Sequence, residues 1–485
     1  MKKHQHAPLG VVCVLLFLWL AFFLPLAFAS VAGSASQDWP MYRHDSGHTG
    51  HSAVTGPATK NVLWNFSTSG NPVNSSPAVV DGKLYVGSEN GNIYCLDAQT
   101  GRQIWLNFKI DSATGSPAIS NGFLYISDAK DLFYCLDAQT GKINWTFSMG
   151  AGGTSPAIAN GYVYVSSGGE NLYCLDALTG QKVWSYPISS LEPATVPTVP
   201  RYIIFAGSTS PAVADERVYI GGTNLYCLSA DSGDLIWSFP SVIAESPTVS
   251  EGKVFFSSWE GDAYCLDAAT GGKIWNHSGI GPGWLGRAPA IVDDRVYFGG
   301  LIYCLNISNG DAIWRYSTGD IAAVTAPVVA GQYAYFSCTD GYAYCADAFT
   351  GEYVWMSKTS FSSSPAVVDG ILYFGSGDSI VAFSDSFKLQ TPILIIIFLT
   401  VVSICVVVVL VVVANRQGKA PSAKWKRVFN VPVTVALISV ILASSFARAN
   451  MCLVCSNSPR SDPWHEQYST ENHRFPQREC KKQKT

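Results

Sequence analysis

The sequence is dominated by a repeat whose first copy runs from Tyr94 to Trp105 and reads YCLDAQTGRQIW. Copies that end in tryptophan follow along the chain at a nearly fixed spacing. They cover Tyr134 to Trp145, Tyr173 to Trp184, Tyr226 to Trp237, Tyr264 to Trp275, Tyr303 to Trp314 and Tyr344 to Trp355. A period of roughly 40 residues is typical of propellers, solenoids and other repeat arrays.

A second signature precedes each copy, a Ser-Pro or Ala-Pro pair that opens an apolar run. In the first unit, apolar runs at 77–80, 83–88, 92–97 and 102–108 are separated by turns containing glycine. Such turns between β-forming residues signal hairpins, because glycine adopts the positive φ they require. Each unit is therefore predicted to be a four-stranded blade. The eight pairs are Ser76-Pro77, Ser116-Pro117, Ser155-Pro156, Ser210-Pro211, Ser246-Pro247, Ala288-Pro289, Ala326-Pro327 and Ser364-Pro365.

The two ends of the array predict a closed ring. The last unit ends near Phe383 without a tryptophan strand, whereas an unassigned strand containing Trp64 lies before the first unit. Pairing these two ends would remove both open sheet edges. The predicted fold class is all-β, an eight-bladed β-propeller over residues 37–385, with a C-terminal transmembrane helix or helical hairpin.

The leader before the repeats contains His44, Asp45, His48 and His51, which are residue types that bind metals. A metal site needs ligands that converge from a rigid frame. This Gly- and Ser-rich stretch has no periodicity that would fix them. We predict that the leader is a strap over one propeller face and holds no metal.

Together these motifs resemble the PQQ-like β-propeller repeat family. The resemblance rests on the leader DWPMYR, the Ser-Pro-Ala-Val starts and the repeats of the form YxLDAxTGxxxW, over about residues 37–385. The family includes the propeller lipoprotein subunit of the outer-membrane protein assembly machine and the quinoprotein alcohol dehydrogenases. The resemblance implies the propeller fold, while the family name describes the repeat and not a bound cofactor.

The repeated residues are interpreted as structural. The aspartate can accept N–H groups across its turn, and the tryptophan can pack between blades. The tryptophans given this role are Trp64, Trp105, Trp145, Trp184, Trp237, Trp275, Trp314 and Trp355. One cysteine per blade recurs at an equivalent position, where ring geometry prevents the roughly 5.5 Å Cα separation of a disulfide. These are interpreted as small buried apolar residues: Cys95, Cys135, Cys174, Cys227, Cys265, Cys304 and Cys345.

No catalytic constellation is apparent in the sequence. The adjacent Cys-Cys pair and the Cys-x-x-Cys-His motif of quinoprotein dehydrogenases are missing. No set of carboxylates and amides suggests a calcium site. We therefore expect no enzymatic activity and no cofactor, PQQ included.

Candidate binding residues directly precede the Ser/Ala-Pro pairs, where the inner strands should begin at the mouth of the central channel. Thr154, Thr209 and Thr325 are polar, and Glu245 and Arg287 are opposite charges on adjacent blades. They could orient a polar ligand or a partner's peptide. The alternative for the charged residues is a mutual ion pair at the channel rim.

Two insertions interrupt the regular spacing, at residues 187–207 and 279–286. Long loops on a rigid scaffold often carry recognition, and exposed aromatic residues are enriched at binding hot spots. The insertions, together with Trp259 and Trp284, are therefore candidate partner surfaces. Both tryptophans could equally pack within the fold.

The chain ends predict targeting and membrane segments. Residues 1–29 have the pattern of a cleaved signal peptide, with an uncleaved anchor as the alternative. Residues 391–414 form an apolar run long enough to span a membrane. The basic loop at 415–427 is then predicted to be cytoplasmic. Residues 428–447 would form a second apolar helix that crosses the membrane or lies in its interface, and residues 448–485 a disordered polar tail.

The predicted function is that of a membrane-anchored extracytoplasmic scaffold, which binds a protein partner at the propeller loops. One alternative is a sensor or binder of a small polar ligand in the central channel, and the other is a quinone-dependent oxidoreductase. A net charge of −4 gives no basis for nucleic-acid binding. The expected location is the cell membrane, with the propeller on the extracytoplasmic side.

Overall fold

The computed structural model describes residues 38–385, apart from 108–109, 114, 169, 189–208, 241–244, 282–287, 300–301, 317–324, 339 and 359–362. These residues belong to one compact unit. They contain no helix that is long and apolar enough to cross a membrane. The predicted signal peptide, membrane segments, basic loop and tail lie outside the described residues.

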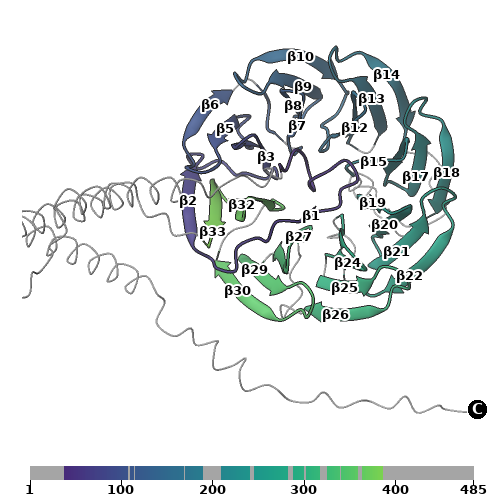
Figure 1. Ribbon diagram of the computed structural model, residues 1–485. Coiled ribbons are helices and arrows are strands. Elements are labelled where there is room, and N and C mark those ends of the chain that lie inside the picture. Colours follow the sequence, from purple (N-terminus) through teal and green to yellow (C-terminus); the bar gives the residue numbers. More distant parts are fainter. Residues whose placement is uncertain are drawn as a thin grey trace, which may run out of the picture. The chain divides into compact units, whose positions relative to one another are not determined.

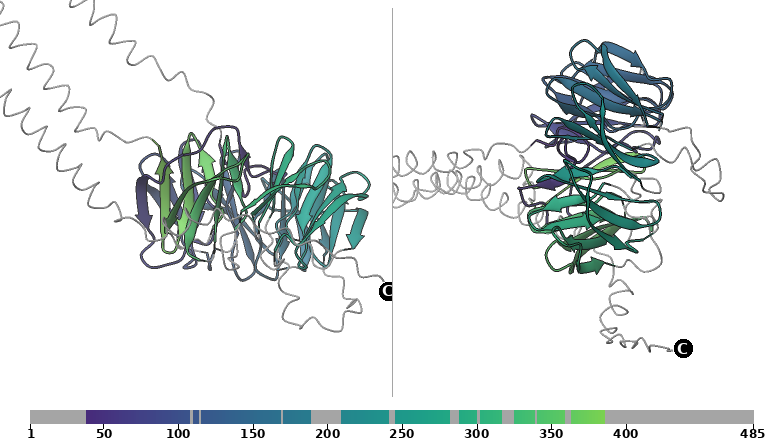
Figure 2. Two further views of the ribbon diagram at one scale, coloured as in Figure 1. Left: turned by 90° about the horizontal axis from the view of Figure 1, so that it is seen from below. Right: turned by 90° about the vertical axis from the view of Figure 1, so that its right-hand side faces the viewer.

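The described residues form eight antiparallel four-stranded blades around a central axis (Figure 1). This arrangement confirms the prediction of an all-β, eight-bladed propeller. Seen from the side, the ring is a flat disc (Figure 2). In each blade the strands follow one another outward from the axis, and the innermost strand has three residues.

Seven blades use four consecutive strands each. The first comprises β3 (Ala78–Val80), β4 (Lys83–Gly87), β5 (Ile93–Asp97) and β6 (Gln103–Asn107). The second comprises β7 (Ala118–Ser120), β8 (Phe123–Ser127), β9 (Leu132–Asp137) and β10 (Ile143–Ser148). The third comprises β11 (Ala157–Ala159), β12 (Tyr162–Ser167), β13 (Asn171–Asp176) and β14 (Lys182–Pro187). The fourth comprises β15 (Ala212–Ala214), β16 (Arg217–Ile220), β17 (Asn224–Ser229) and β18 (Leu235–Pro240).

The remaining blades continue this order. The fifth comprises β19 (Thr248–Ser250), β20 (Lys253–Ser257), β21 (Asp262–Asp267) and β22 (Lys273–Ser278). The sixth comprises β23 (Ala290–Val292), β24 (Arg295–Phe298), β25 (Ile302–Asn306) and β26 (Ala312–Tyr316). The seventh comprises β27 (Val328–Ala330), β28 (Tyr333–Ser337), β29 (Tyr342–Asp347) and β30 (Tyr353–Lys358), and the short β1 (His51–Ser52) joins it. The eighth comprises β31 (Ala366–Val368), β32 (Ile371–Ser376), β33 (Ser379–Ser384) and β2 (Val62–Ser67).

The eighth blade closes the ring with strands from both ends of the propeller. The N-terminal strand β2 pairs antiparallel with β33, and Trp64 lies opposite Ala382 in the register. The predicted pairing of the Trp64 strand with the last unit is therefore confirmed. Because β2 occupies the outer position of this blade, the first and last repeats are held together without an open edge between them.

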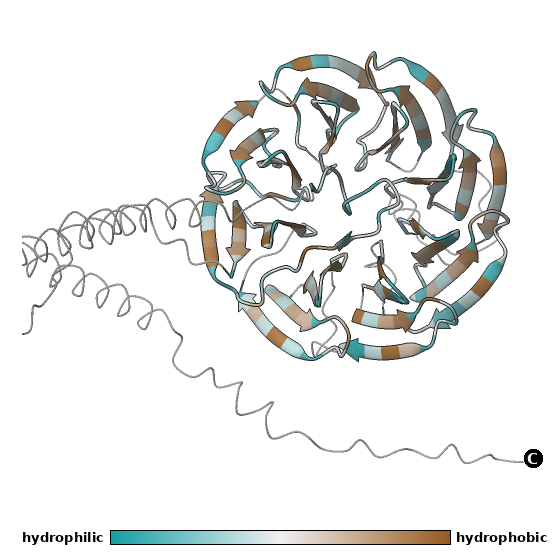
Figure 3. Ribbon diagram, in the orientation of Figure 1, coloured by the Kyte–Doolittle hydropathy of each residue, from teal (hydrophilic) through white to brown (hydrophobic). Residues whose placement is uncertain are grey.

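Position within a blade explains the composition of each strand. The middle strands are covered on both faces by neighbouring blades, so nearly every residue is buried, as in β5. The outer strands alternate instead, as in β18, where Leu235 and Ile236 are exposed and Trp237 is partly buried. Figure 3 shows this alternation as hydrophobic and hydrophilic bands along the outer strands.

A recurring clasp joins each blade to the next. In seven of the eight cases the indole Nε1 of the repeat tryptophan donates to a main-chain carbonyl in the turn after the third strand of the next blade, at 2.8 Å for Trp64 to Ala98 and 3.0 Å for Trp105 to Ala138. The turn glycine lies against the same indole: a Cβ added to Gly141, whose φ is 71°, would meet Trp105 at 2.6 Å. Glycine is therefore required both for its conformation and for the close approach.

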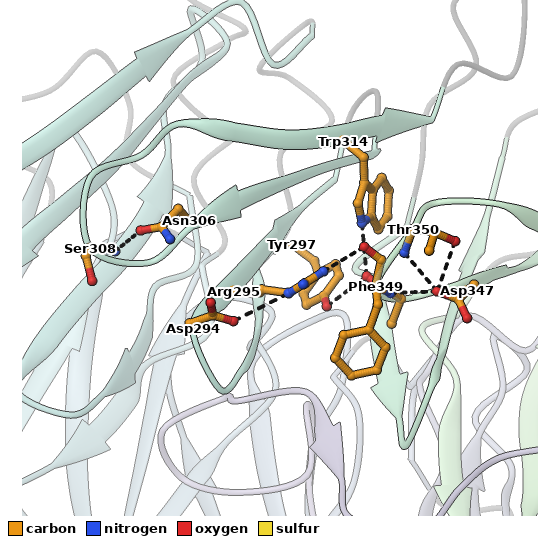
Figure 4. A network of polar contacts seen from close by, with 10 residues as sticks. Asp294, Arg295, Tyr297, Asn306, Ser308, Trp314, Asp347, Phe349 and Thr350 are labelled. Carbon is orange, nitrogen blue, oxygen red and sulfur yellow. Dashed lines mark hydrogen bonds and ion pairs between the residues drawn. The ribbon is translucent and has the colours of Figure 1, made fainter.

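The clasp between the sixth and seventh blades shows the full set of contacts (Figure 4). Trp314 Nε1 donates to Ala348 O at 3.0 Å, and the hydroxyl of Tyr297 donates to the same oxygen at 3.1 Å. Arg295 Nη1 donates to Phe349 O at 2.7 Å, and its guanidinium carbon lies 4.9 Å from the Phe349 ring centroid. These contacts fix the angle between adjacent blades.

The leader supplies the acceptor that the eighth blade lacks for Trp355 of the seventh blade. In the other blades this acceptor lies in the turn between the third and fourth strands, but the fourth strand of the eighth blade is β2, which comes from the N-terminus. Instead, Trp355 Nε1 donates to Pro57 O at 3.4 Å and the Tyr335 hydroxyl donates to it at 3.0 Å. The leader therefore completes the inter-blade contacts as well as the ring.

The repeat aspartate organises its turn by accepting several hydrogen bonds. Asp137 Oδ1 accepts from the N–H and the hydroxyl of Thr140, both at 2.7 Å, and from the Gln139 N–H at 3.1 Å. The hydrogen bonds from Thr140 lower the pKa of this carboxyl. In the sixth blade Asn306 occupies the equivalent position, and its Oδ1 accepts from the Ser308 N–H at 2.9 Å.

We expect Asp137→Ala to lower the free energy of unfolding by about 1 kcal/mol, because the turn loses these acceptors. Asp137→Asn should retain most of the stability, since an amide oxygen serves at Asn306. Urea denaturation of the full chain, followed by circular dichroism, compares the two variants. Equal losses in both would contradict the role assigned to the acceptor oxygen.

Candidate functional site

The leader crosses the central channel and bonds to the inner strands, as the purple segment in Figure 1 shows. Its first contact is reciprocal, between the main chains of Trp39 and Val79 at 2.7 and 2.8 Å. Main-chain carbonyls of the leader then accept hydrogen bonds from the N–H groups of five further inner strands. The pairs are Pro40 with Ile119, Ser46 with Val213, Gly47 with Val249, Thr49 with Ile291 and Gly50 with Val329. The leader is therefore a strap over the propeller, as predicted.

Arg43 is a cation buried within this strap. Its side chain is 2% exposed, and its Nη1 donates to Pro327 O at the start of the seventh inner strand. The Nε and Nη2 atoms are buried and have no hydrogen-bond partner in the described part of the chain. Burial lowers the pKa of Arg43 to about 10, so the side chain remains charged at neutral pH.

Gly50 makes room for the guanidinium. Its φ is 62°, and a Cβ added there would lie 2.2 Å from Arg43 Nη2. Its N–H also donates to Arg43 O at 2.9 Å. Only glycine satisfies both the left-handed backbone and the contact with the arginine.

His48 is the second fully buried polar side chain of the strap. Its Nδ1 lies 3.3 Å from Pro247 O, and its Nε2 is buried without a hydrogen-bond partner among the described residues. Burial lowers the pKa of His48 to about 4, with the charge of Arg43 acting in the same direction. The imidazole is therefore neutral at pH 7, and a hydrogen bond to Pro247 requires the Nδ1–H tautomer.

The other leader residues considered as metal ligands do not converge on one site. Asp45 accepts from the Thr49 N–H at 3.0 Å and lies 3.4 Å from His44 Nδ1. Within the described residues there is no group of three or more His, Cys, Asp or Glu side chains that could hold a metal ion. The carboxylate of Asp45 instead caps the turn that carries His48.

The threonines predicted at the channel mouth lie at the start of the inner strands. The hydroxyl of Thr209 donates to Gly221 O at 2.7 Å, and that of Thr154 lies 3.0 Å from Ser166 Oγ. The hydroxyl of Thr325 lies 2.5 Å from Ser337 Oγ. Each hydroxyl therefore bonds within its own blade, to the end of the second strand.

The remaining predicted binding residues are only partly described. The Glu245 N–H donates to Ser257 O at 3.0 Å at the start of the fifth inner strand, and its side chain is half-buried. Trp259 is half-buried in the turn between β20 and β21. Arg287, Trp284 and most of the two insertions lie outside the described residues.

The Ser-Pro serines link neighbouring blades around part of the axis. The N–H of Ser364 donates to Ser76 Oγ, that of Ser76 to Ser116 Oγ, and that of Ser116 to Ser155 Oγ, at 2.9–3.0 Å. These bonds connect consecutive inner strands. The sequence marks these positions, but the bonds between blades become visible only in the folded ring.

The repeat cysteines are buried free thiols. Burial raises the pKa of Cys95 and of Cys135 to about 12. A thiol with such a pKa is not ionised at neutral pH and is a poor nucleophile. These observations agree with the interpretation of the repeat cysteines as apolar core residues.

The fold and the site define a class of protein: an eight-bladed repeat propeller whose N-terminal strand closes the ring and whose leader crosses the channel. A family model described as outer membrane protein assembly factor BamB matches residues 50–190 and 188–386, more than half of the chain. The chain belongs to this family.

Individual relatives are more distant. The outer membrane protein assembly factor BamB of Alkalilimnicola ehrlichii is 26% identical over 199 residues, which are 36% of this chain and 50% of that protein. This chain therefore matches about half the length of that relative.

Solved structures share the fold at low sequence identity. BamB from Moraxella catarrhalis has a TM-score of 0.55 and 19% identity. The match covers 68% of this chain and 98% of the BamB chain. A quinohemoprotein alcohol dehydrogenase from Pseudomonas putida has a TM-score of 0.60 and 15% identity. The match covers 73% of this chain and 81% of the dehydrogenase chain. At these identities the likeness shows the fold alone.

Proposed function

We propose that this chain is a membrane-anchored extracytoplasmic propeller that acts as a protein-binding scaffold. Membership of the BamB family supports the scaffold role, because the family description is that of an assembly factor. The anchor and the side of the membrane rest on the sequence patterns at residues 1–29 and 391–447.

The observation that carries the proposal is an apolar belt on the outer strands. The residue directly before the repeat tryptophan is an exposed aliphatic side chain in several blades: Ile104 is 43% exposed, Ile236 45% and Ile274 45%. Single exposed apolar residues need no explanation. Their recurrence at one position around a rigid ring, however, gives a repeated surface suited to a protein partner.

The polar residues of the repeat offer less to a partner, because the fold already uses them. The tryptophan N–H groups bond to the next blade, the aspartates bond within their turns, and the hydroxyls of Thr154, Thr209 and Thr325 bond within their blades. Such satisfied groups have little remaining hydrogen-bonding capacity for recognition. The outer surface is therefore the proposed place for a partner to bind.

The test is purification of the full chain from its native membranes, with one belt residue changed at a time. Variants Ile104→Asp, Ile236→Asp and Ile274→Asp are compared with Ser238→Asp, a change at an exposed polar position of β18. We expect a partner in stoichiometric amount with the wild type and the Ser238 variant, and its loss with at least one belt variant. An unchanged partner in every variant, or no stoichiometric partner, would overturn the proposal.

A further inference from the structure

The buried guanidinium of Arg43 has unused hydrogen-bonding capacity with a defined geometry. Nη1 donates to Pro327 O, whereas Nε and Nη2 have no partner among the residues that the structure describes. Nε–H and one Nη2–H are parallel and form the side-on fork of a guanidinium. This fork matches the two oxygens of a carboxylate or phosphate.

The charge of Arg43 is not balanced by an ion pair among the described residues. Asp45 is an acidic residue of the strap, and its charge does act on Arg43. Its oxygens, however, accept from the N–H and hydroxyl of Thr49 and contact His44. A buried charge without a paired partner is costly, which favours a counter-ion at this place.

The two buried side chains extend from the strap along the inner strands. Gly50 O accepts from Val329 N, whereas Arg43 reaches Pro327 O, two residues earlier on the same strand. In the same way, Gly47 O accepts from Val249 N, whereas His48 reaches Pro247 O. Arg43 and His48 therefore project toward the end of the channel at which the inner strands begin.

We propose that the central channel beneath the strap binds a small oxyanion, held by Nε and Nη2 of Arg43. The ligand class is a carboxylate or a phosphate, because both offer two oxygens with the spacing of the fork. The strap is then a binding element in addition to a clasp.

The experiment is a titration of the full chain with sodium phosphate and, separately, with sodium acetate, with ionic strength held constant by sodium chloride. We expect a saturable rise in the thermal unfolding midpoint, since a ligand that binds only the folded state stabilises it. Arg43→Lys keeps the charge but loses the fork, and should weaken the apparent affinity at least about tenfold. Arg102→Lys, at an exposed position, should leave it unchanged.

A crystal structure of the wild type grown with phosphate gives a second readout that does not depend on the folding of a variant. Tetrahedral density within hydrogen-bonding distance of Arg43 Nε and Nη2 is expected. A water molecule or a protein group at that position would overturn the proposal. So would a non-saturable response in the wild type, or the same saturation in Arg43→Lys, because these indicate a general salt effect.

Discussion

Replacing Trp64 by alanine is expected to lower the free energy of unfolding by about 3–5 kcal/mol, the usual cost of truncating a buried aromatic residue. Trp64 is buried on β2, the strand that closes the ring. Its indole packs against Gly101 and donates to Ala98 O at 2.8 Å. The substitution therefore removes a core side chain and the bond between the closing strand and the first blade.

Chemical denaturation of the full chain, followed by circular dichroism, measures this loss. Trp259→Ala is the matched control, because this tryptophan is half-buried in a turn outside the repeat. The control should lose much less stability. Limited proteolysis should also cut Trp64→Ala more readily near β2, since a weakened closing strand detaches more often. Equal losses in the two variants would contradict the closing role of Trp64.

Acidification is expected to destabilise the propeller through His48, by about 3 kcal/mol between pH 6.5 and pH 4. In the folded chain, burial lowers the pKa of His48 from the ordinary 6.5 to about 4. Below pH 6.5 the unfolded chain binds a proton at this residue, and the folded chain does not. Stability therefore falls as the pH falls through this window, and the loss is complete below the folded pKa.

The comparison is between the wild type and His48→Asn, measured by denaturation at several pH values in buffers without phosphate or carboxylate. An asparagine amide can donate to Pro247 O as Nδ1–H does, but it does not titrate. The variant should lack this part of the pH dependence. His51, whose pKa is also lowered by burial, contributes equally to both proteins. Identical pH profiles would show that His48 is not held neutral by the fold.

Much of the fold could be predicted because it repeats. The four apolar runs, the turn glycines and the spacing of the tryptophans are local signals, and they recur in each unit. Ring closure could also be predicted, since the last unit lacks a tryptophan strand and Trp64 lies on a strand that belongs to no complete unit. The burial of the repeat cysteines follows from the same argument, because equivalent positions in a ring stay apart.

Much less of the candidate site could be predicted from the sequence. The position of Thr154, Thr209 and Thr325 before the inner strands predicts a place at the channel mouth, but each hydroxyl bonds within its blade. The sequence indicates where the main chain lies, whereas hydrogen bonding within the blade decides whether a hydroxyl is available to a ligand. In the sequence, Arg43 stands out only as part of the leader motif. A buried arginine could have been suspected from its place beside Trp39, Met41 and Tyr42, which are all buried.

The sequence by itself determined the blade, the number of blades and the strand that closes them, because these depend on periodic patterns within about 40 residues. Only the tertiary structure decided the path of the leader and the burial of Arg43 and His48. Their partners are main-chain groups of Pro327 and Pro247, about 200 or more residues away in the sequence. Every blade carries such groups, so no side-chain pattern marks the ones that are used, and the choice is made when the ring brings the inner strands to one axis.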